Sequence, residues 1–318
     1  MSLDVETVLE RRRLRRQVGV WRGLAILAGV IVLAAYGFMN ARTTGVIGAS
    51  QIARVTVSGV ITDDRKRLKL LERIANASNV RGVILFVDSP GGTTTGGEGL
   101  FLALRELAAK KPLAAQFGTV AASAAYIAGL GTDHIVAREN SITGSVGVIF
   151  QWPEVSQLLE NVGVKVNQIK SGTLKAEPSP FEPTNPEALS VVREMVEESQ
   201  SWFVGLVEQR RNIRALDVAG LTQGRVFSGR MAKQLGLIDA IGGEEEAVAW
   251  MVRERNVPEG LKVVDWKPEE PFSLSFAQNT RGWLAWILGS DHPWVTAATK
   301  LDALALDGLL SVWQPAEK

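Results

Sequence analysis

The stretch GVILFVDSPGG, residues 82–92, decides the fold class of this chain. Apolar residues follow one another from Val83 to Val87, which is typical of a strand buried on both faces of a parallel sheet. The Pro-Gly-Gly that ends the stretch is a turn signal. We therefore expect a buried parallel strand that stops at a tight turn.

Strands and helices alternate on both sides of this stretch. In residues 52–61, apolar and polar side chains alternate and β-branched side chains are frequent, as in a strand. Residues 65–77 have an amphipathic helical pattern. The other predicted elements are helices at 96–111, 123–131, 153–163, 185–212 and 244–255, and strands at 112–120, 134–139, 144–150, 164–172 and 261–266. Residues 224–243 are predicted to form a turn, a helix and a tight loop. This order predicts an α/β fold with a largely parallel sheet.

The N-terminal region predicts a membrane anchor. Residues 1–22 are basic, with six arginines between positions 11 and 22, and residues 23–39 carry no charge. We expect a transmembrane helix at 23–40 with the N-terminus in the cytoplasm, because positive charges favour that side. A cleaved signal peptide is the alternative interpretation.

The rest of the chain divides into three parts. A linker at 41–51 precedes a catalytic domain at 52–267, and a tail at 268–318 is rich in tryptophan and leucine. The tail could rest on a membrane surface, pack on a partner or cover the domain. The apolar stripe of the helix at 185–212 fits packing on the sheet or a subunit contact.

Composition excludes several classes of function. The chain has 318 residues, a formal net charge of +1, no cysteine and two histidines. Disulfides and cysteine metal sites are excluded, a zinc site is not expected, and the charge gives no sign of nucleic-acid binding.

Ser123 is the first candidate for chemistry, because it lies where a predicted strand gives way to a predicted helix. Its own N–H, together with that of Gly91 or Gly92, could stabilise an oxyanion there. The alternative is that Ser123 is simply a small residue that lets the helix and the sheet pack closely. His134 falls in the next strand and His292 in the tail. Neither histidine is expected beside Ser123, so a Ser-His-Asp triad is not predicted.

A lysine can replace histidine as the general base only if it is neutral near pH 7. Burial must then lower its pKa from about 10.4 by roughly 3. Lys170 and Lys175 follow a predicted strand and are the two candidates, although most lysines are simply exposed.

Five ordered motifs give the chain a resemblance to the signal peptide peptidase A family of membrane-anchored bacterial serine peptidases, half-size form. They are FVDSPGG, AASAAY, SITGSVGVI, KSGTLKAEPSP and GRVFSGRMAKQLGLIDAIGG, and they span about residues 52–251. Many members have Ser-Gly-Gly-Tyr where this chain has Ser-Ala-Ala-Tyr, from which we expect a changed pocket shape with activity retained.

The resemblance implies a Ser-Lys dyad. Ser123 matches the nucleophile, and Lys175 matches the general base because a Ser-Pro pair follows it, which leaves Lys170 aside. Ser145 matches a serine that contacts the lysine amine, and Gly91 or Gly92 would complete the oxyanion hole.

The resemblance also implies a Clp protease/crotonase-like fold, a spiral of strand-strand-helix units. It implies a homo-oligomer whose sites combine serine and lysine from neighbouring subunits, with no metal or organic cofactor. The expected substrates are remnant signal peptides and other membrane or periplasmic peptides. The chain would be held by one helix in the cytoplasmic membrane, with its catalytic domain on the outer side.

Two other functions remain open from the sequence. One is a catalytically silent oligomeric scaffold that binds peptides. The other is a crotonase-type enzyme acting on acyl-CoA, which the expected outward topology disfavours, because those substrates are cytosolic.

Overall fold

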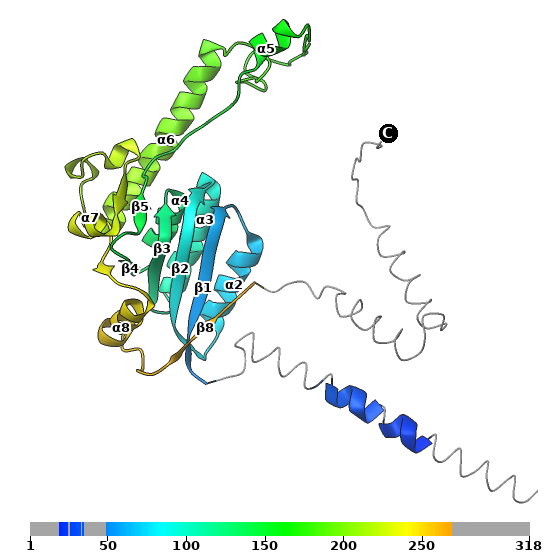
Figure 1. Cartoon of the computed structure of the whole chain (residues 1–318), viewed down its shortest axis with the longest axis vertical. Coiled ribbons are helices and arrows are strands. Elements are labelled where there is room, and N and C mark those ends of the chain that lie inside the picture. The colour runs from blue at the N-terminus through cyan, green and yellow to red at the C-terminus, as the bar shows by residue number, and fades with distance from the viewer. Residues whose placement is uncertain (1–18, 25, 33, 35–48, 269–318) are drawn as a thin grey trace, which may run out of the picture. The chain divides into compact units, whose positions relative to one another are not determined.

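The fold is α/β around one eight-stranded sheet (Figure 1). The computed structural model describes residues 19–24, 26–32, 34 and 49–268. The main path of the sheet is β6-β5-β3-β2-β1-β8, and β4 pairs with β3 and with β7. The strands are β1 (Gln51–Ile61), β2 (Val80–Gly92), β3 (Leu113–Ala122), β4 (His134–Ala137), β5 (Ile142–Gly144), β6 (Val226–Ser228), β7 (Ala240–Ile241) and β8 (Lys262–Asp265).

The predicted parallel sheet is confirmed. Every strand pair is parallel except β5 with β6. The helices are α2 (Arg65–Asn76), α3 (Thr94–Ala108), α4 (Ala124–Leu130), α5 (Ser156–Asn161), α6 (Pro186–Arg211), α7 (Gly229–Gln234) and α8 (Glu244–Arg255), and two 3₁₀ turns span Ala215–Asp217 and Leu221–Gln223.

The central strands are buried on both faces near their N-terminal ends. On one face, side chains of β1, β2 and β3 pack with those of α2, α3 and α4 in the main core. On the other face, Ile84 and Ala114 pack under Trp250 and Met251 of α8 in a smaller cluster. Burial on two sides explains the unbroken apolar run of β2.

Helix α6 joins the sheet to a projecting segment, residues 149–185, which we call the arm. Asn185 caps α6, and Pro186 occupies its first turn. At the other end, Arg211 contacts Asp239 at 2.7 Å and Arg210 donates to the Leu130 carbonyl at 2.8 Å. Figure 1 shows α5 and the rest of the arm at the end of α6 that is remote from the sheet.

Two predicted strands are wrong in whole or in part. The strand expected at 144–150 ends at Gly144 as β5, and residues 164–172 form no strand. In both segments apolar and polar side chains alternate as they do in strands, but a strand also needs a neighbouring strand to pair with. Residues 164–172 lie in the arm, where no strand among the described residues pairs with them.

The predicted anchor falls only partly on described residues. Residues 19–24, 26–32 and 34 are helical, and residues 25, 33 and 35–40 lie outside the description. Within the described ranges, no helix has both the length and the apolarity needed to cross a membrane. The linker before residue 49 and the tail after Pro268 are also outside the described residues.

Candidate active site

Ser123 occupies a strained turn between β3 and α4. Its backbone angles are φ 56° and ψ −124°, which a non-glycine residue seldom adopts. The N–H groups of Tyr126 and Ile127 both donate to the Ser123 carbonyl, so the helix starts directly after it. Its side chain makes no capping hydrogen bond. A sharp strand-to-helix turn of this kind is how many hydrolases present a nucleophile.

The glycine loop after β2 packs against this turn. Gly91 has φ +120°, and a Cβ at that position would lie 2.9 Å from the Ser123 Cβ. A Cβ on Gly92 would lie 1.9 Å from the Ile61 carbonyl oxygen. Both positions therefore require glycine, and the loop lies directly beside Ser123.

The backbone N–H groups of Ser123 and Gly91, which the sequence suggested as oxyanion donors, are both engaged in hydrogen bonds. The Ser123 N–H donates to the Gly144 carbonyl at 2.9 Å, because the β3–β5 pairing continues one residue past Ala122. It is therefore not available to an oxyanion, and that expectation is wrong. The Gly91 N–H donates to the Ser89 Oγ at 3.1 Å.

Ala124 is a donor that the sequence analysis missed. It is the first residue of α4, where an N–H group has no acceptor within its own helix. A Cβ on Gly91 would lie 3.3 Å from the Ala124 nitrogen, so this N–H borders the same small space as Ser123. Its position directly after the nucleophile candidate was the signal that could have found it.

Ser145 lies at the same edge of the sheet as Ser123. Gly144 pairs with Ala122, so the residues that follow these two are neighbours. Ser145 also has a positive φ, of 52°, and its N–H donates to the Arg225 carbonyl at 2.9 Å. The fold thus brings the two predicted serines together.

Lys175 lies elsewhere in the chain. Its N–H donates to the Gly172 carbonyl at 3.1 Å in a turn of the arm, and its side chain is exposed. Since the arm lies at the remote end of α6, one chain does not bring Lys175 to Ser123 (Figure 1).

Lys170 is held in an ion-pair cluster. Its Nζ lies 2.6 Å from Glu177 and 2.9 Å from Glu182. Hydrogen bonds to Glu177 and then Glu182 raise the pKa of Lys170, so its amine is cationic at neutral pH. A cationic amine cannot accept the proton of a serine.

His134 is not a base for Ser123. It pairs with Ala114 at the start of β4, and Ala114 is nine residues before Ser123. At about 3.3 Å per residue the separation is roughly 30 Å. The ring of His134 stacks on Trp250 with 4.7 Å between centroids, and burial lowers its pKa. His292 lies outside the described residues, within which no cluster of metal-binding side chains occurs.

Tyr126 has a structural role. It is fully buried, and its hydroxyl donates to the Leu237 carbonyl at 2.7 Å. Burial raises its pKa, so the phenol stays protonated. This bond ties α4, and with it the Ser123 turn, to the segment after α7.

Comparison with known proteins gives consistent matches. The model of "Peptidase family S49" matches residues 105–258. "Putative protease slr0021" of Synechocystis sp. is 35% identical over 63% of this chain and 73% of its own length. "Putative signal peptide peptidase SppA" of Enterococcus faecium is 34% identical over 69% of this chain and 68% of its own.

Two more distant matches complete the comparison. "Protease 4" of Haemophilus influenzae is 30% identical, and the match covers 63% of this chain and 34% of that protein. Among solved structures, a membrane-bound stomatin-specific protease, 1510-N, is 13% identical with a TM-score of 0.46, over 70% of this chain and 100% of that one.

Proposed function

Because the chain belongs to peptidase family S49, the family of signal peptide peptidase A, we propose that it is a serine endopeptidase with Ser123 as the nucleophile. The observation that carries the proposal is the strained Ser123 turn packed against Gly91. Strain of about 1–3 kcal/mol at one residue persists where the surroundings impose it, and such residues cluster at active sites.

The reaction follows from the groups at this turn. The Ser123 Oγ attacks the carbonyl carbon of a peptide bond while a base takes its proton. The negative oxygen of the tetrahedral intermediate accepts a hydrogen bond from the Ala124 N–H, and Gly92 is the proposed second donor, because the Gly91 N–H already donates to Ser89. The C–N bond breaks as the base returns the proton to the leaving amine. Water, activated by the same base, then hydrolyses the acyl-enzyme.

The base in this proposal is Lys175 of a neighbouring copy of the chain. Two observations support a lysine supplied from outside. Within one chain the arm keeps Lys175 remote from Ser123, and Lys170 is fixed as a cation by Glu177 and Glu182. Ser145, next to Ser123, would hold the incoming amine through its hydroxyl.

The surface of the arm fits such a contact. Its exposed large apolar side chains are Ile149, Phe150, Leu158, Val162, Val164, Val166, Ile169, Leu174 and Phe181. So much apolar surface in one segment is typical of a protein–protein interface. We infer a homo-oligomer in which each arm packs on the next subunit.

The substrates in this proposal are extended peptides, including remnant signal peptides. The Enterococcus relative carries the name of a signal peptide peptidase, which supports this class. The uncharged run 23–39 behind a cluster of arginines supports anchoring in the cytoplasmic membrane, with the catalytic domain outside the cytoplasm. Membrane pellets of cells expressing the full chain should retain it after carbonate washing, and release by the wash would overturn the anchoring.

Fluorophosphonate labelling tests the nucleophile and the base. The full chain should be labelled and should cleave a fluorogenic apolar peptide, and Ser123→Ala should lose both properties. Lys175→Ala should lose turnover, whereas Lys165→Ala, a matched control with another exposed lysine of the arm, should keep it. A labelled Ser123→Ala protein, or an active Lys175→Ala protein, would refute the assignment.

A further inference from the structure

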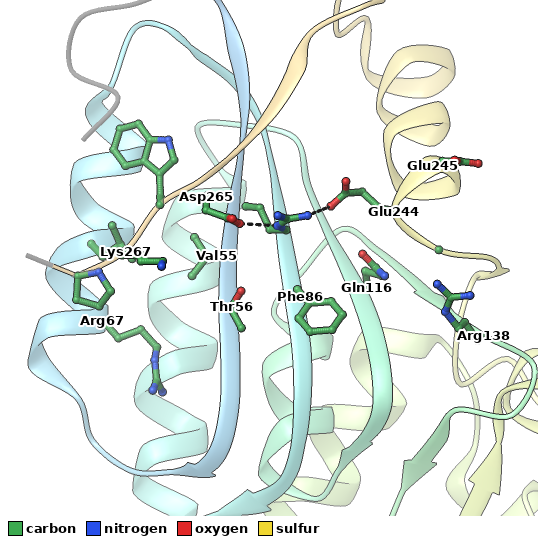
Figure 2. A pocket seen from close by; sticks show the side chains of 15 residues that line it. Val55, Thr56, Arg67, Phe86, Gln116, Arg138, Glu244, Glu245, Asp265 and Lys267 are labelled. Carbon is green, nitrogen blue, oxygen red and sulfur yellow. Dashed lines mark hydrogen bonds and ion pairs between the residues drawn. The ribbon is translucent and has the colours of Figure 1, made fainter. Parts of the chain in front are cut away.

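A cavity of about 890 Å³, lined by both apolar and charged residues, lies away from the candidate active site (Figure 2). Its volume falls within the range of roughly 300–1,000 Å³ that is common for ligand sites. Gln116 lines it and precedes Ser123 by seven residues. At about 3.3 Å per residue, the cavity lies some 20 Å from the serine.

The register of the sheet explains why this cavity is open. Thr56 pairs with Phe86, and Phe86 pairs with Gln116, so the three form one row across β1, β2 and β3. Ile84 and Ala114 lie two residues earlier on the same face and are covered by α8. Helix α8 begins at Glu244, so its cover stops there and the next row becomes the floor of a cavity.

Gln116 has an amide group that nothing in the described chain satisfies. The residue is only 7% exposed, and its side chain makes no hydrogen bond within residues 49–268. The amide atoms themselves are not fully buried: they open into the cavity, where water or a ligand can hydrogen-bond to them. Figure 2 shows Gln116 next to Phe86 on the cavity floor. A ligand that offers both a donor and an acceptor would satisfy it.

The charged side chains that line the cavity are four cations, Arg54, Arg67, Arg138 and Lys267, and three carboxylates, Glu244, Glu245 and Asp265. Arg54 is neutralised by Asp265 at 2.6 Å and Glu244 at 2.7 Å. Arg138, near Gln116, and Lys267, near Thr56, form no ion pair with any described residue. The cavity therefore offers cationic donors at both ends of the row and the half-buried ring of Phe86 between them.

We propose that this cavity binds the C-terminal end of an extended peptide, with the carboxylate at Arg138 and Gln116 and an apolar side chain on Phe86. The row from Thr56 to Gln116 spans two strand spacings, or about 10 Å, which is the length of about three extended residues. Each cut by an endopeptidase creates such a carboxylate. The inference rests on the proposed function for the source of the peptide, whereas its binding stands on the cavity alone.

Fluorescence anisotropy with the full-chain Ser123→Ala protein tests the site without cleavage. The probe is a fluorescein-labelled pentapeptide of alanine and leucine with a free carboxylate. It should bind saturably, and the same peptide with a C-terminal amide should bind at least about tenfold more weakly, because a charge-assisted hydrogen bond is lost. Decanoate has a carboxylate and an apolar chain but no amide N–H to donate to the Gln116 Oε1, so it should compete less well than the unlabelled peptide.

Variants in the same background locate the binding. Gln116→Leu and Arg138→Gln should each weaken binding of the free acid by roughly five- to tenfold or more. Gln116→Leu should melt close to its parent, because the amide that it removes makes no hydrogen bond with any described residue. Arg253→Gln, an exposed arginine of α8 outside the cavity, is the matched control and should bind normally.

Three results would overturn the inference: equal binding of acid and amide, strong competition by decanoate, or unchanged binding by both cavity variants. None of them bears on the catalytic assignment, because that assignment is tested separately, by labelling and cleavage with the Ser123→Ala and Lys175→Ala proteins.

Discussion

Replacing Gly91 with alanine tests whether the glycine loop and the Ser123 turn act as one unit. The new Cβ would lie 2.9 Å from the Ser123 Cβ and 3.1 Å from the Ala122 carbonyl oxygen. Ordinary contact starts at 3.4 Å, so the turn must move by about 0.5 Å (3.4 − 2.9). A misplacement of 1 Å costs about 100-fold in rate, so we expect a loss of roughly 10- to 100-fold.

The same change also carries a cost in stability. Alanine at φ +120° adds strain of about 1–3 kcal/mol. For a domain of some 200 residues, each kcal/mol lowers Tm by about 2–4 °C, so Tm should fall by roughly 2–12 °C. Gly59→Ala is the matched control, because Gly59 has φ +67° with open space around it. It should lose about 1 kcal/mol and keep full activity.

Two assays separate these effects. Thermal unfolding by circular dichroism gives the stability of each variant, and the rate of fluorophosphonate labelling well below Tm gives the reactivity of Ser123. Labelling of Gly91→Ala at the wild-type rate would refute the reasoning, as would an equal loss of rate in Gly59→Ala.

Two further predictions concern packing away from the reaction. The folded pKa of His134 lies below its usual value near 6.5, so the native state takes up a proton less readily than the unfolded state. The free energy of unfolding, measured in urea, should therefore fall as pH drops from about 6.5. His134→Phe keeps the stacking on Trp250 and should make the free energy of unfolding less dependent on pH. An unchanged pH dependence would contradict the burial argument. Tyr126→Phe leaves the buried Leu237 carbonyl without its donor and should cost about 1 kcal/mol, with labelling of the serine unchanged; a melting temperature equal to wild type would contradict the proposed tie.

Much of the fold could be predicted from local pattern. The apolar run of β2 and its Pro-Gly-Gly turn predict a buried parallel strand, and the same strand does form the middle of the sheet. The switch from strand to helix at Ser123 is equally local, because small residues and a change of period mark it. Residues 164–172 show the limit of this reasoning, since their alternation says nothing about whether a partner strand exists.

The site could be predicted only in part, for the same physical reason. Ser123, Ser145 and Gly91 lie together because their strands end at the same edge of the sheet, and the sequence pattern does not specify which strands are neighbours. The engagement of the Ser123 N–H by Gly144 depends on one extra hydrogen bond beyond the end of β3. The place of Lys175 depends on the direction of α6, which no local pattern specifies.

The central claim is that Ser123 of one subunit works with Lys175 of the next, and mixing two inactive proteins tests it most directly. Ser123→Ala and Lys175→Ala proteins are combined in equal amounts, dissociated and reassembled, with two affinity tags to verify that mixed oligomers form. Random assembly places an intact serine beside an intact lysine in about a quarter of the sites. The account predicts recovery of about that fraction of wild-type turnover, and mixed oligomers with no turnover would contradict it.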